Sequence, residues 1–169
     1  DQSEDENAQN VEGQTEQSQT EQSLLAAFLL SMNANPHSVC CELPCSCLSY
    51  MQLFHLATAY QRLLGRSIRG CTGPVVICLD LKTERMAAIL AVLMEGCAFG
   101  VLDEGHDLAK QLHVFNAQFI VASSKDSVWQ CLQEVCAASQ TNDMKELHCI
   151  DVSNASLPLH ARMKRRGQQ

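Results

Sequence analysis

The chain has 169 residues, which is enough for one domain with a hydrophobic core. Of its 19 acidic and 12 basic side chains, seven acidic and no basic ones lie in residues 1–23, which leaves twelve of each sign elsewhere. The formal charge of −7 therefore comes from an N-terminal tail. This distribution excludes an acidic surface on the folded part that would bind a partner. Because this polar stretch has few apolar residues to bury, we predict that residues 1–23 are disordered.

The first predicted elements lie in residues 24–50. Leu24 to Met32 is expected to form a short helix that stops at 33–36. Val39–Glu42 and Cys47–Tyr50 are predicted to pair as a small hairpin. The helix is expected to bury Leu24, Leu25, Phe28 and Leu29.

A second helix is predicted to begin after the hairpin. Ser49 and Gln52 form a capping box at its start, and Gly65 is expected to end the helix after Leu64. A loop over 66–74 would follow. The inward face of this helix is predicted to consist of Leu53, Leu56, Ala57, Tyr60, Leu63 and Leu64.

The centre of the chain has the pattern of a βαβ unit. An apolar strand at Val75–Leu81 is followed by a helix at about Thr83–Glu95, a left-handed cap at Gly96 and a second strand at Cys97–Leu102. The two strands should be parallel, with a right-handed crossover. The helix is predicted to have an inward-facing apolar stripe. Its members are Met86, Ile89, Leu90, Leu93 and Met94, and alanines 87, 88 and 91 are predicted to widen it.

The alternation continues to residue 152. A helix over 108–115 is expected to be capped by Asp107, and a second helix, Asp126–Ala138, by Ser123 and Ser124. Strands are predicted at Phe119–Ala122 and Leu147–Val152. The inward residues would be Leu108, Leu112 and Phe115 in the first helix, and Val128, Trp129, Leu132, Val135 and Cys136 in the second.

Alternating strands and helices predict an α/β fold, with a mostly parallel sheet flanked by helices, over residues 24–152. Residues 153–169 are predicted to form a basic flexible tail or linker. Its basic segment, His160–Arg166, fits a solvated linker better than a nucleic-acid or targeting patch.

Ten cysteines occur, and most lie within apolar runs, as small buried residues of a reducing compartment do. The apolar segment at 24–32 is too short to span a membrane and follows an acidic stretch, so we expect no secretory signal, a cytoplasmic location and free thiols. The chain begins at Asp1 and not at methionine, which suggests a processed or excerpted chain. The cysteines in apolar runs are Cys78, Cys97, Cys131, Cys136 and Cys149.

Local motifs for chemistry are weak. Four cysteines near His37 could supply zinc ligands, but their spacing is irregular, so ordinary thiols are favoured. His106 follows a strand end, where α/β proteins bind ligands, yet a turn histidine without a role is favoured. Asn154-Ala155-Ser156 matches the acceptor pattern for N-glycosylation, and we interpret the match as chance. The four cysteines are Cys40, Cys41, Cys45 and Cys47, and the other histidines are His55, His113, His148 and His160, which form no HExxH motif.

The order of elements is more informative than any single site. Leu48–Leu53 resembles the first core motif of adenylate-forming enzymes, which lies where a strand passes into a helix. Leu93–Asp103 resembles their second motif, and Pro36–Val39 lies where the family has a proline-aspartate-x-valine segment. The resemblance covers residues 24–125 and is nearest to the adenylation domains of nonribosomal peptide synthetases and to related acyl-CoA synthetases. The matched residues of the second motif are Leu93, Gly96, Ala98, Phe99, Leu102 and Asp103.

The resemblance implies an enzyme that couples a carboxylic acid, here an amino acid, to ATP and then passes the acyl group to a thiol. It also implies a fold, that of the N-terminal subdomain of such enzymes. Val101 and Glu104 replace prolines of the second motif, and Cys97 replaces a residue that is usually glycine. The family's phosphate loop, ribose-binding acid and catalytic lysine would lie beyond Gln169, because Ser123-Ser124-Lys125 lacks the glycines that surround phosphate.

We therefore expect a scaffold segment with no catalytic, cofactor-binding or metal residues of its own; ATP and Mg²⁺ would belong to the complete enzyme. Expected partners are the remainder of the adenylation domain or a carrier protein, with no nucleic acid and no membrane. An exposed apolar face would favour self-association. The alternative is a non-catalytic α/β interaction or regulatory module derived from the same fold.

Overall fold

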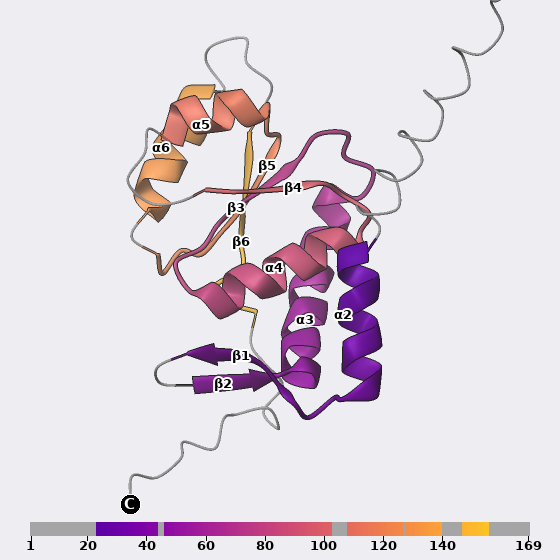
Figure 1. The fold of residues 1–169 in the computed structure, drawn as a ribbon. Helices are drawn as coiled ribbons and strands as arrows, with labels where there is room; N and C mark the ends of the chain where they lie inside the picture. The colour runs from indigo at the N-terminus through magenta and orange to yellow at the C-terminus, as the bar shows by residue number, and fades with distance from the viewer. Residues whose placement is uncertain (1–22, 44–45, 103–107, 127, 140–146, 156–169) are drawn as a thin grey trace, which may run out of the picture.

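The computed structural model describes residues 23–43, 46–102, 108–126, 128–139 and 147–155 (Figure 1). The predicted tails 1–23 and 153–169 lie almost entirely outside these residues. The elements in chain order are α2 (Ser23–Ala34), β1 (Val39–Leu43), β2 (Ser46–Ser49), α3 (Tyr50–Ile68), β3 (Val75–Cys78), α4 (Lys82–Met94), β4 (Phe99–Val101), α5 (Leu108–Phe115), β5 (Phe119–Ala122), α6 (Trp129–Ser139) and β6 (His148–Asp151).

A four-stranded sheet with the order β4-β3-β5-β6 forms the centre, and all its strand pairs are parallel. Val75 of β3 is level with Phe99 of β4 on one side and with Phe119 of β5 on the other. The hairpin β1-β2 is a separate antiparallel pair. The predicted α/β class, the parallel βαβ pairing and the hairpin are therefore confirmed.

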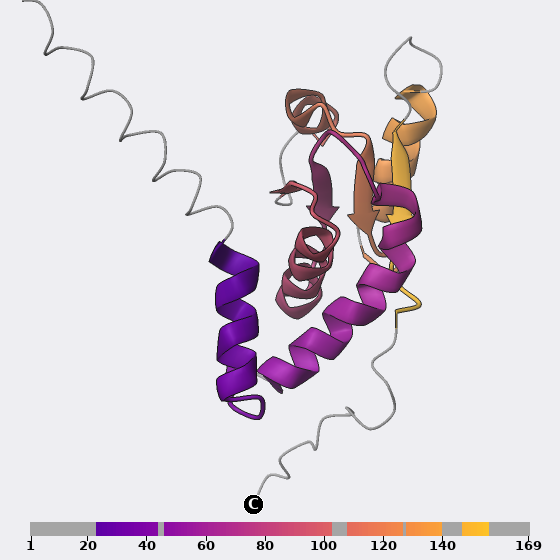
Figure 2. The ribbon, with the colours of Figure 1, turned by 90° about the vertical axis from the view of Figure 1, so that its right-hand side faces the viewer.

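Helices cover both faces of the sheet (Figures 1 and 2). Val75 and Ile77 of β3 pack into the core beneath α3 and α4, whereas Val76 and Cys78 pack into a second core beneath α5 and α6. Alternate residues of a strand point to opposite faces, so a strand buried on both sides is apolar throughout. All four residues of β3 are fully buried, as this arrangement requires.

Helix α3 begins as predicted but continues past the predicted end. The Ser49 hydroxyl accepts a hydrogen bond from the Gln52 amide at 3.3 Å, and the Gln52 side chain accepts one from the Ser49 amide at 2.9 Å. The prediction that Gly65 ends the helix is wrong: α3 runs to Ile68. The glycine with positive φ is Gly70 at +76°, so the left-handed residue that follows the helix lies five positions later.

The buried face of α4 agrees in part with the predicted one, since Leu90 is buried as expected. Met86 is 38% exposed, while Ala87, Ala88, Ala91 and Val92 are fully buried in the core that contains α3. Small side chains allow α4 to pack closely against its neighbours, and the alanines are among the most deeply buried residues of the helix. The predicted left-handed cap is confirmed, since Gly96 has a φ of +73°.

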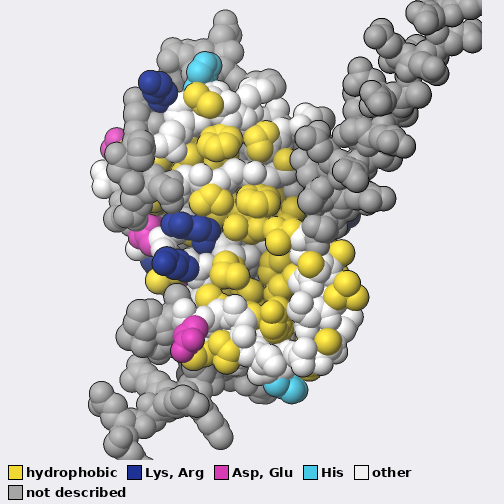
Figure 3. Space-filling view, in the orientation of Figure 1, with side chains coloured by type: hydrophobic (Ala, Val, Ile, Leu, Met, Phe, Trp, Pro, Cys, Tyr) yellow, Lys and Arg dark blue, Asp and Glu magenta, His cyan; other side chains and the backbone are white. Residues whose placement is uncertain are grey.

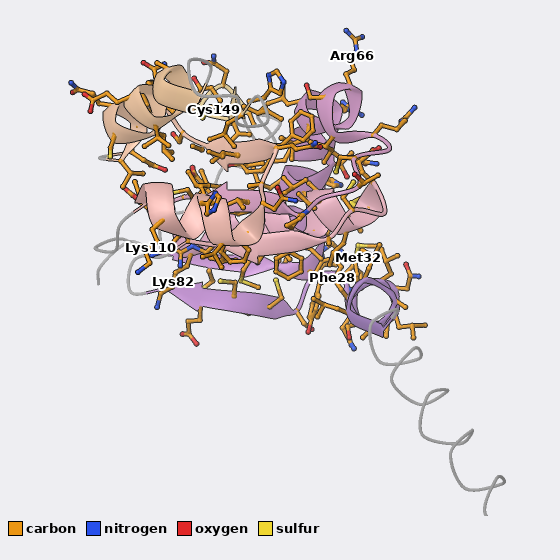
Figure 4. The ribbon with its side chains drawn as sticks, turned by 90° about the horizontal axis from the view of Figure 1, so that it is seen from above. Phe28, Met32, Arg66, Lys82, Lys110 and Cys149 are labelled. Carbon is orange, nitrogen blue, oxygen red and sulfur yellow. The ribbon has the colours of Figure 1, made fainter. Side chains whose placement is uncertain are left out.

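Helix α2 packs against the N-terminal end of α3. The ring of Phe28 lies 5.6 Å from that of Tyr50, and Figure 4 shows Phe28 and Met32 pointing from α2 toward the rest of the molecule. The prediction that Leu24 is buried is wrong, because this side chain is 53% exposed. Leu30 of the same helix is 71% exposed. Hydrophobic side chains gather on the face of the molecule over α2 and α4 (Figure 3).

Two further predictions need correction. Leu63 was expected to face inward from α3 but is 42% exposed, because its neighbour Leu64 takes the buried position. Helix α6 begins at Trp129 and not at Asp126, since the residues after β5 form a turn in which the Asp126 amide donates to the Ser123 carbonyl. Helix α6 buries Leu132, as predicted, and the other residues predicted to face inward are half-buried.

Candidate functional site at the carboxyl edge of the sheet

Polar side chains gather where three parallel strands end. Asp80 follows β3, the segment Ser123–Asp126 follows β5, and Asp151 is the last residue of β6. The carboxyl ends of parallel strands meet at one edge of the sheet, and ligands of open α/β sheets bind outside that edge. This edge of the sheet is therefore the candidate ligand-binding site.

Asp151 is the centre of a hydrogen-bond network that joins the ends of β5 and β6. One oxygen, Oδ1, accepts from the Ser124 amide at 3.0 Å and from the Ser153 amide at 2.9 Å. The other oxygen accepts from the Ser153 hydroxyl at 3.0 Å. Burial alone would raise the pKa of Asp151, but these hydrogen bonds favour the ionised form and together hold the pKa below its ordinary value.

The turn after β5 uses its donors internally. The Ser124 amide donates to Asp151, the Lys125 amide to the Ser123 hydroxyl at 3.2 Å, and the Asp126 amide to the Ser123 carbonyl at 3.0 Å. The Lys125 ammonium donates to the carbonyl of Ser153 at 3.1 Å. A phosphate site needs free backbone donors and a cation that faces the ligand. The turn does not fit a nucleotide phosphate, because an aspartate of the same chain holds one of its amides.

Three further carboxylates lie on the α3 and α4 side of this edge. The Asp80 amide donates to Asp126 Oδ2 at 3.2 Å, and burial followed by the charges of Asp80 and Asp151 raises the pKa of Asp126. Burial and the nearby Asp126 raise the pKa of Glu84, although Lys125 opposes this shift. The pKa of the buried Tyr60 is also raised, by burial first and then by Glu84 and Asp126. The negative charges of these carboxylates disfavour the binding of an anionic ligand nearby.

The end of β3 is fixed by a cation from α4. Arg85 donates to the Leu79 carbonyl from Nε at 3.0 Å and from Nη2 at 2.8 Å. This guanidinium satisfies a carbonyl that the strand ladder leaves open. The polar groups of the edge thus connect the ends of three strands to the adjoining turns, and their geometry supports a structural role.

The zinc candidate does not gather into a site among the described residues. No group of three or more histidine, cysteine, aspartate or glutamate side chains in the described part of the chain could hold a metal ion. Cys40 donates from Sγ to the Leu48 carbonyl at 3.4 Å, Cys47 is exposed, and Cys45 lies outside the described residues. All nine cysteines that the structure describes are free thiols.

The histidines are distributed over different elements. His37, His55, His113 and His148 are exposed, and the ring of His148 stacks on Phe119 with centroids 5.5 Å apart. His106 and His160 lie outside the described residues, as does the Ser156 that would complete the glycosylation match of Asn154.

The edge network was not predicted from the sequence. Ser124 and Asp151 are 27 positions apart, and neither belongs to a recognisable motif. A weak signal was available, since an acid lies near the end of each of two predicted strands, and Ser123-Ser124-Lys125 follows the strand predicted at Phe119–Ala122. Only the strand order, which places β5 between β3 and β6, shows that these turns meet.

The two motifs that carried the resemblance occupy junctions of the fold. Leu48 lies in β2 and Ser49 caps α3, so Leu48–Leu53 spans the passage from strand to helix. Leu93 to Leu102 spans the end of α4, the Gly96 cap and β4, with Leu102 fully buried and its amide bonded to the Ile77 carbonyl at 3.0 Å. Both motifs therefore form part of the packed framework.

Comparison with known proteins gives structural matches without sequence matches. No protein-family model matches the sequence, and no curated protein sequence matches it. Among solved structures, the chain is similar to O-succinylbenzoate coenzyme A synthetase (MenE) from Bacillus subtilis in complex with AMP, with a TM-score of 0.60 and 14% identity over 76% of this chain and 31% of that one.

Two other structures give the same result. VinN in complex with 3-methylaspartate matches with a TM-score of 0.57 and 16% identity, over 79% of this chain and 34% of that one. The N-terminal subdomain of Klebsiella oxytoca NpsA, in complex with 3-hydroxybenzoyl-AMSN, matches with a TM-score of 0.52 and 14% identity, over 59% of this chain and 26% of that one.

These neighbours establish the fold. All three are adenylate-forming enzymes, and this chain has the fold of their N-terminal subdomain, as predicted. The chain spans 26–34% of the length of these structures.

Proposed function

We propose that this chain is the N-terminal scaffold of an adenylate-forming ligase that activates an amino acid with ATP and transfers the acyl group to a thiol. The observation that supports this most is the placement of the two resembling motifs. They lie at the β2–α3 and α4–β4 junctions of a fold that the chain shares with MenE, VinN and NpsA. Sequence order and spatial position thus favour the same kind of enzyme.

The part played by this chain is to form the framework and not the reaction centre. The serine-rich turn that follows β5, Ser123–Lys125, uses its amides within the chain. ATP and Mg²⁺ would be held by residues outside the 169 present here. The 3-methylaspartate named with VinN supports a substrate of amino-acid type, whereas MenE and NpsA are named with O-succinylbenzoate and a 3-hydroxybenzoyl group.

The partners follow from the same proposal. The remainder of an adenylation domain would cover the apolar face over α2 and α4, and a carrier protein would receive the acyl group. We expect a cytoplasmic location and no nucleic-acid partner. Among the described residues, none of the helices combines the length and apolar character needed to cross a bilayer.

The test is carboxylate-dependent ATP–pyrophosphate exchange by the complete gene product. The transcript is sequenced through the Gln169 codon, and the encoded protein is assayed with each amino acid. Exchange stimulated by one amino acid supports the proposal, particularly if a glycine-rich serine/threonine loop follows in the sequence. A stop codon soon after Gln169, or a longer product without exchange activity, would contradict it.

The second candidate is a non-catalytic interaction or regulatory module. The network around Asp151 favours it, because the amide of Ser124, at the edge where such a sheet would face a ligand, is bonded to Asp151 within the chain. A chain that ends near Gln169 and forms a stable one-to-one complex with another protein would support this alternative.

A further inference from the structure

Two thiols at the opposite edge of the sheet lie almost in bonding distance. Cys71 belongs to the loop between α3 and β3, and Cys97 to the turn between α4 and β4. Their Sγ atoms are 3.4 Å apart. A disulfide bond is about 2.05 Å long, so the two sulfurs would need to approach by only about 1.4 Å.

The backbone holds both cysteines in place. β3 and β4 are neighbouring parallel strands, and the Val75 amide donates to the Ala98 carbonyl at 2.8 Å, which ties together the segments that carry the two cysteines. The Cys71 amide donates to the Ile68 carbonyl at 2.9 Å, and the Cys97 amide to the Val92 carbonyl at 3.2 Å. Because neighbouring parallel strands begin at the same edge, this juxtaposition follows from the topology.

The sulfur atoms are also anchored, and they differ in access. Cys97 Sγ lies 3.3 Å from the Ile68 carbonyl oxygen, and Cys71 Sγ lies 3.4 Å from the Gly73 carbonyl oxygen. Cys97 is 6% exposed, whereas Cys71 is half-buried. Burial, and then the hydrogen bond with Cys71, raises the pKa of Cys97 to about 11, so Cys97 stays protonated at neutral pH. Cys71 is therefore the thiol that meets an oxidant first.

We propose that Cys71 and Cys97 form an oxidative modification site, in which a hydroperoxide converts the pair to an intramolecular disulfide. This proposal is independent of the proposed function. It gives the chain a reversible covalent link between the loop that leads into β3 and the turn that leads into β4.

The chemistry balances in two steps. The Cys71 thiolate attacks one oxygen of hydrogen peroxide, the O–O bond breaks, and a sulfenic acid and hydroxide form; the hydroxide takes up the proton that Cys71 released. The Cys97 sulfur then attacks the Cys71 sulfur and loses its proton, and the S–O bond breaks to release water. In sum, two thiols and one hydrogen peroxide give one disulfide and two waters.

The test is disulfide mapping of the full 169-residue chain. The reduced protein, freed of reductant, is treated with hydrogen peroxide at low protein concentration, alkylated under denaturing conditions and digested with trypsin. We expect the peptide 70–82 to appear linked to the peptide 86–110, with a mass lower by two hydrogen atoms than their sum and with reversal by reductant. Peptide 70–82 also contains Cys78, so fragment ions or the Cys78→Ser variant assign the bond to Cys71.

Matched variants sharpen the result. Cys71→Ser and Cys97→Ser should each abolish the linked peptide, while Cys131→Ser, at an exposed position of α6, should leave it unchanged. The oxidised wild-type chain should also unfold at a higher urea concentration than the reduced chain, because the bond closes a loop in the unfolded state. The proposal is overturned if Cys71 and Cys97 of the wild-type chain remain separately alkylated under conditions that oxidise Cys131, or if they bond to other cysteines.

Discussion

Gly65, inside α3, lies directly against Glu95, the residue that follows α4: a β-carbon at position 65 would be 3.0 Å from the Glu95 Oε1 atom. The Glu95 side chain is only 7% exposed. Gln61 donates to its Oε1 at 2.9 Å and Arg69 to its Oε2 at 3.4 Å. The absence of a side chain at position 65 therefore lets the ends of α3 and α4 meet around this carboxylate.

This contact predicts a large effect of a bulky residue at position 65. Gly65→Val should destabilise the chain by about 2 kcal/mol, because overpacking would push Glu95 from its partners. Ser67→Val is the control, at an exposed position of the same helix, and should cost less than about 0.5 kcal/mol. Urea unfolding of both variants checks the prediction, and equal losses of stability would show that the Gly65–Glu95 contact is unimportant.

A second glycine is predicted to be intolerant of a side chain because an aromatic ring lies close to it. A β-carbon on Gly100 of β4 would come within 2.8 Å of the Phe115 Cε1 atom of α5. Gly100→Ala should therefore cost about 2 kcal/mol, more than the roughly 1 kcal/mol expected for Gly96→Ala, where only the left-handed backbone is strained.

A double-mutant cycle isolates the contact at Gly100. In the Gly100→Ala, Phe115→Leu double variant the smaller side chain should relieve the clash, so the combined loss of stability should be smaller than the sum of the two single losses. Strict additivity in urea unfolding would argue against a steric role of Phe115.

The core strands and most helix starts could be predicted because their signals are local. β3 and β5 are continuous apolar runs between turn residues, and the Ser49–Gln52 capping box needs only four residues. The misplaced end of α3 has a different cause. Gly65 looked like a helix terminator, whereas its role depends on Glu95, which is 30 positions away.

The same distinction explains the other differences. Met86 was predicted to lie on the inward face of α4 but is 38% exposed, whereas the alanines that were expected only to widen this face are fully buried. The carboxyl-edge network joins Ser124 with Asp151 and Asp80 with Asp126, pairs that are far apart in sequence. The resemblance to adenylate-forming enzymes predicted the fold correctly because it depended on the order of junctions.

The Asp151 network predicts a specific pH dependence. Its pKa is held below the ordinary value of 3.8, so the folded state binds its proton less readily than the unfolded state. The resulting stabilisation is complete above about pH 4 and is lost as the pH falls through the lowered folded pKa. Asp151→Asn should cost about 1–2 kcal/mol at neutral pH, since amides and a hydroxyl donate to the charged form.

Measurement of urea unfolding between acid and neutral pH checks this sign. The difference between wild type and Asp151→Asn should shrink below about pH 4. Glu84→Gln serves as the control of opposite sign. Burial and Asp126 raise the Glu84 pKa, so the wild type gains stability relative to this variant as the pH falls from neutral toward 4.5. A loss in Asp151→Asn that does not vary with pH would contradict the assignment.

The apolar face over α2 and α4 predicts self-association of the isolated chain (Figure 3). Leu30 of α2 is 71% exposed and Val114 of α5, beneath the other face of the sheet, is 75% exposed. If association uses the α2–α4 face, Leu30→Glu should shift the chain toward monomer while Val114→Glu has no effect. Light scattering over a range of concentrations measures this. A wild-type chain that stays monomeric at all concentrations would contradict the prediction.

We propose that these 169 residues form the framework of an adenylate-forming enzyme and do not hold its nucleotide. Isothermal titration of the folded chain with ATP and MgCl₂ tests it most directly. We predict no saturable heat up to about 1 mM ATP, an affinity weaker than about −4 kcal/mol, because the amides of the turn after β5 are engaged by Asp151 and Ser123. One-site binding with a micromolar dissociation constant would show that the chain holds the nucleotide itself.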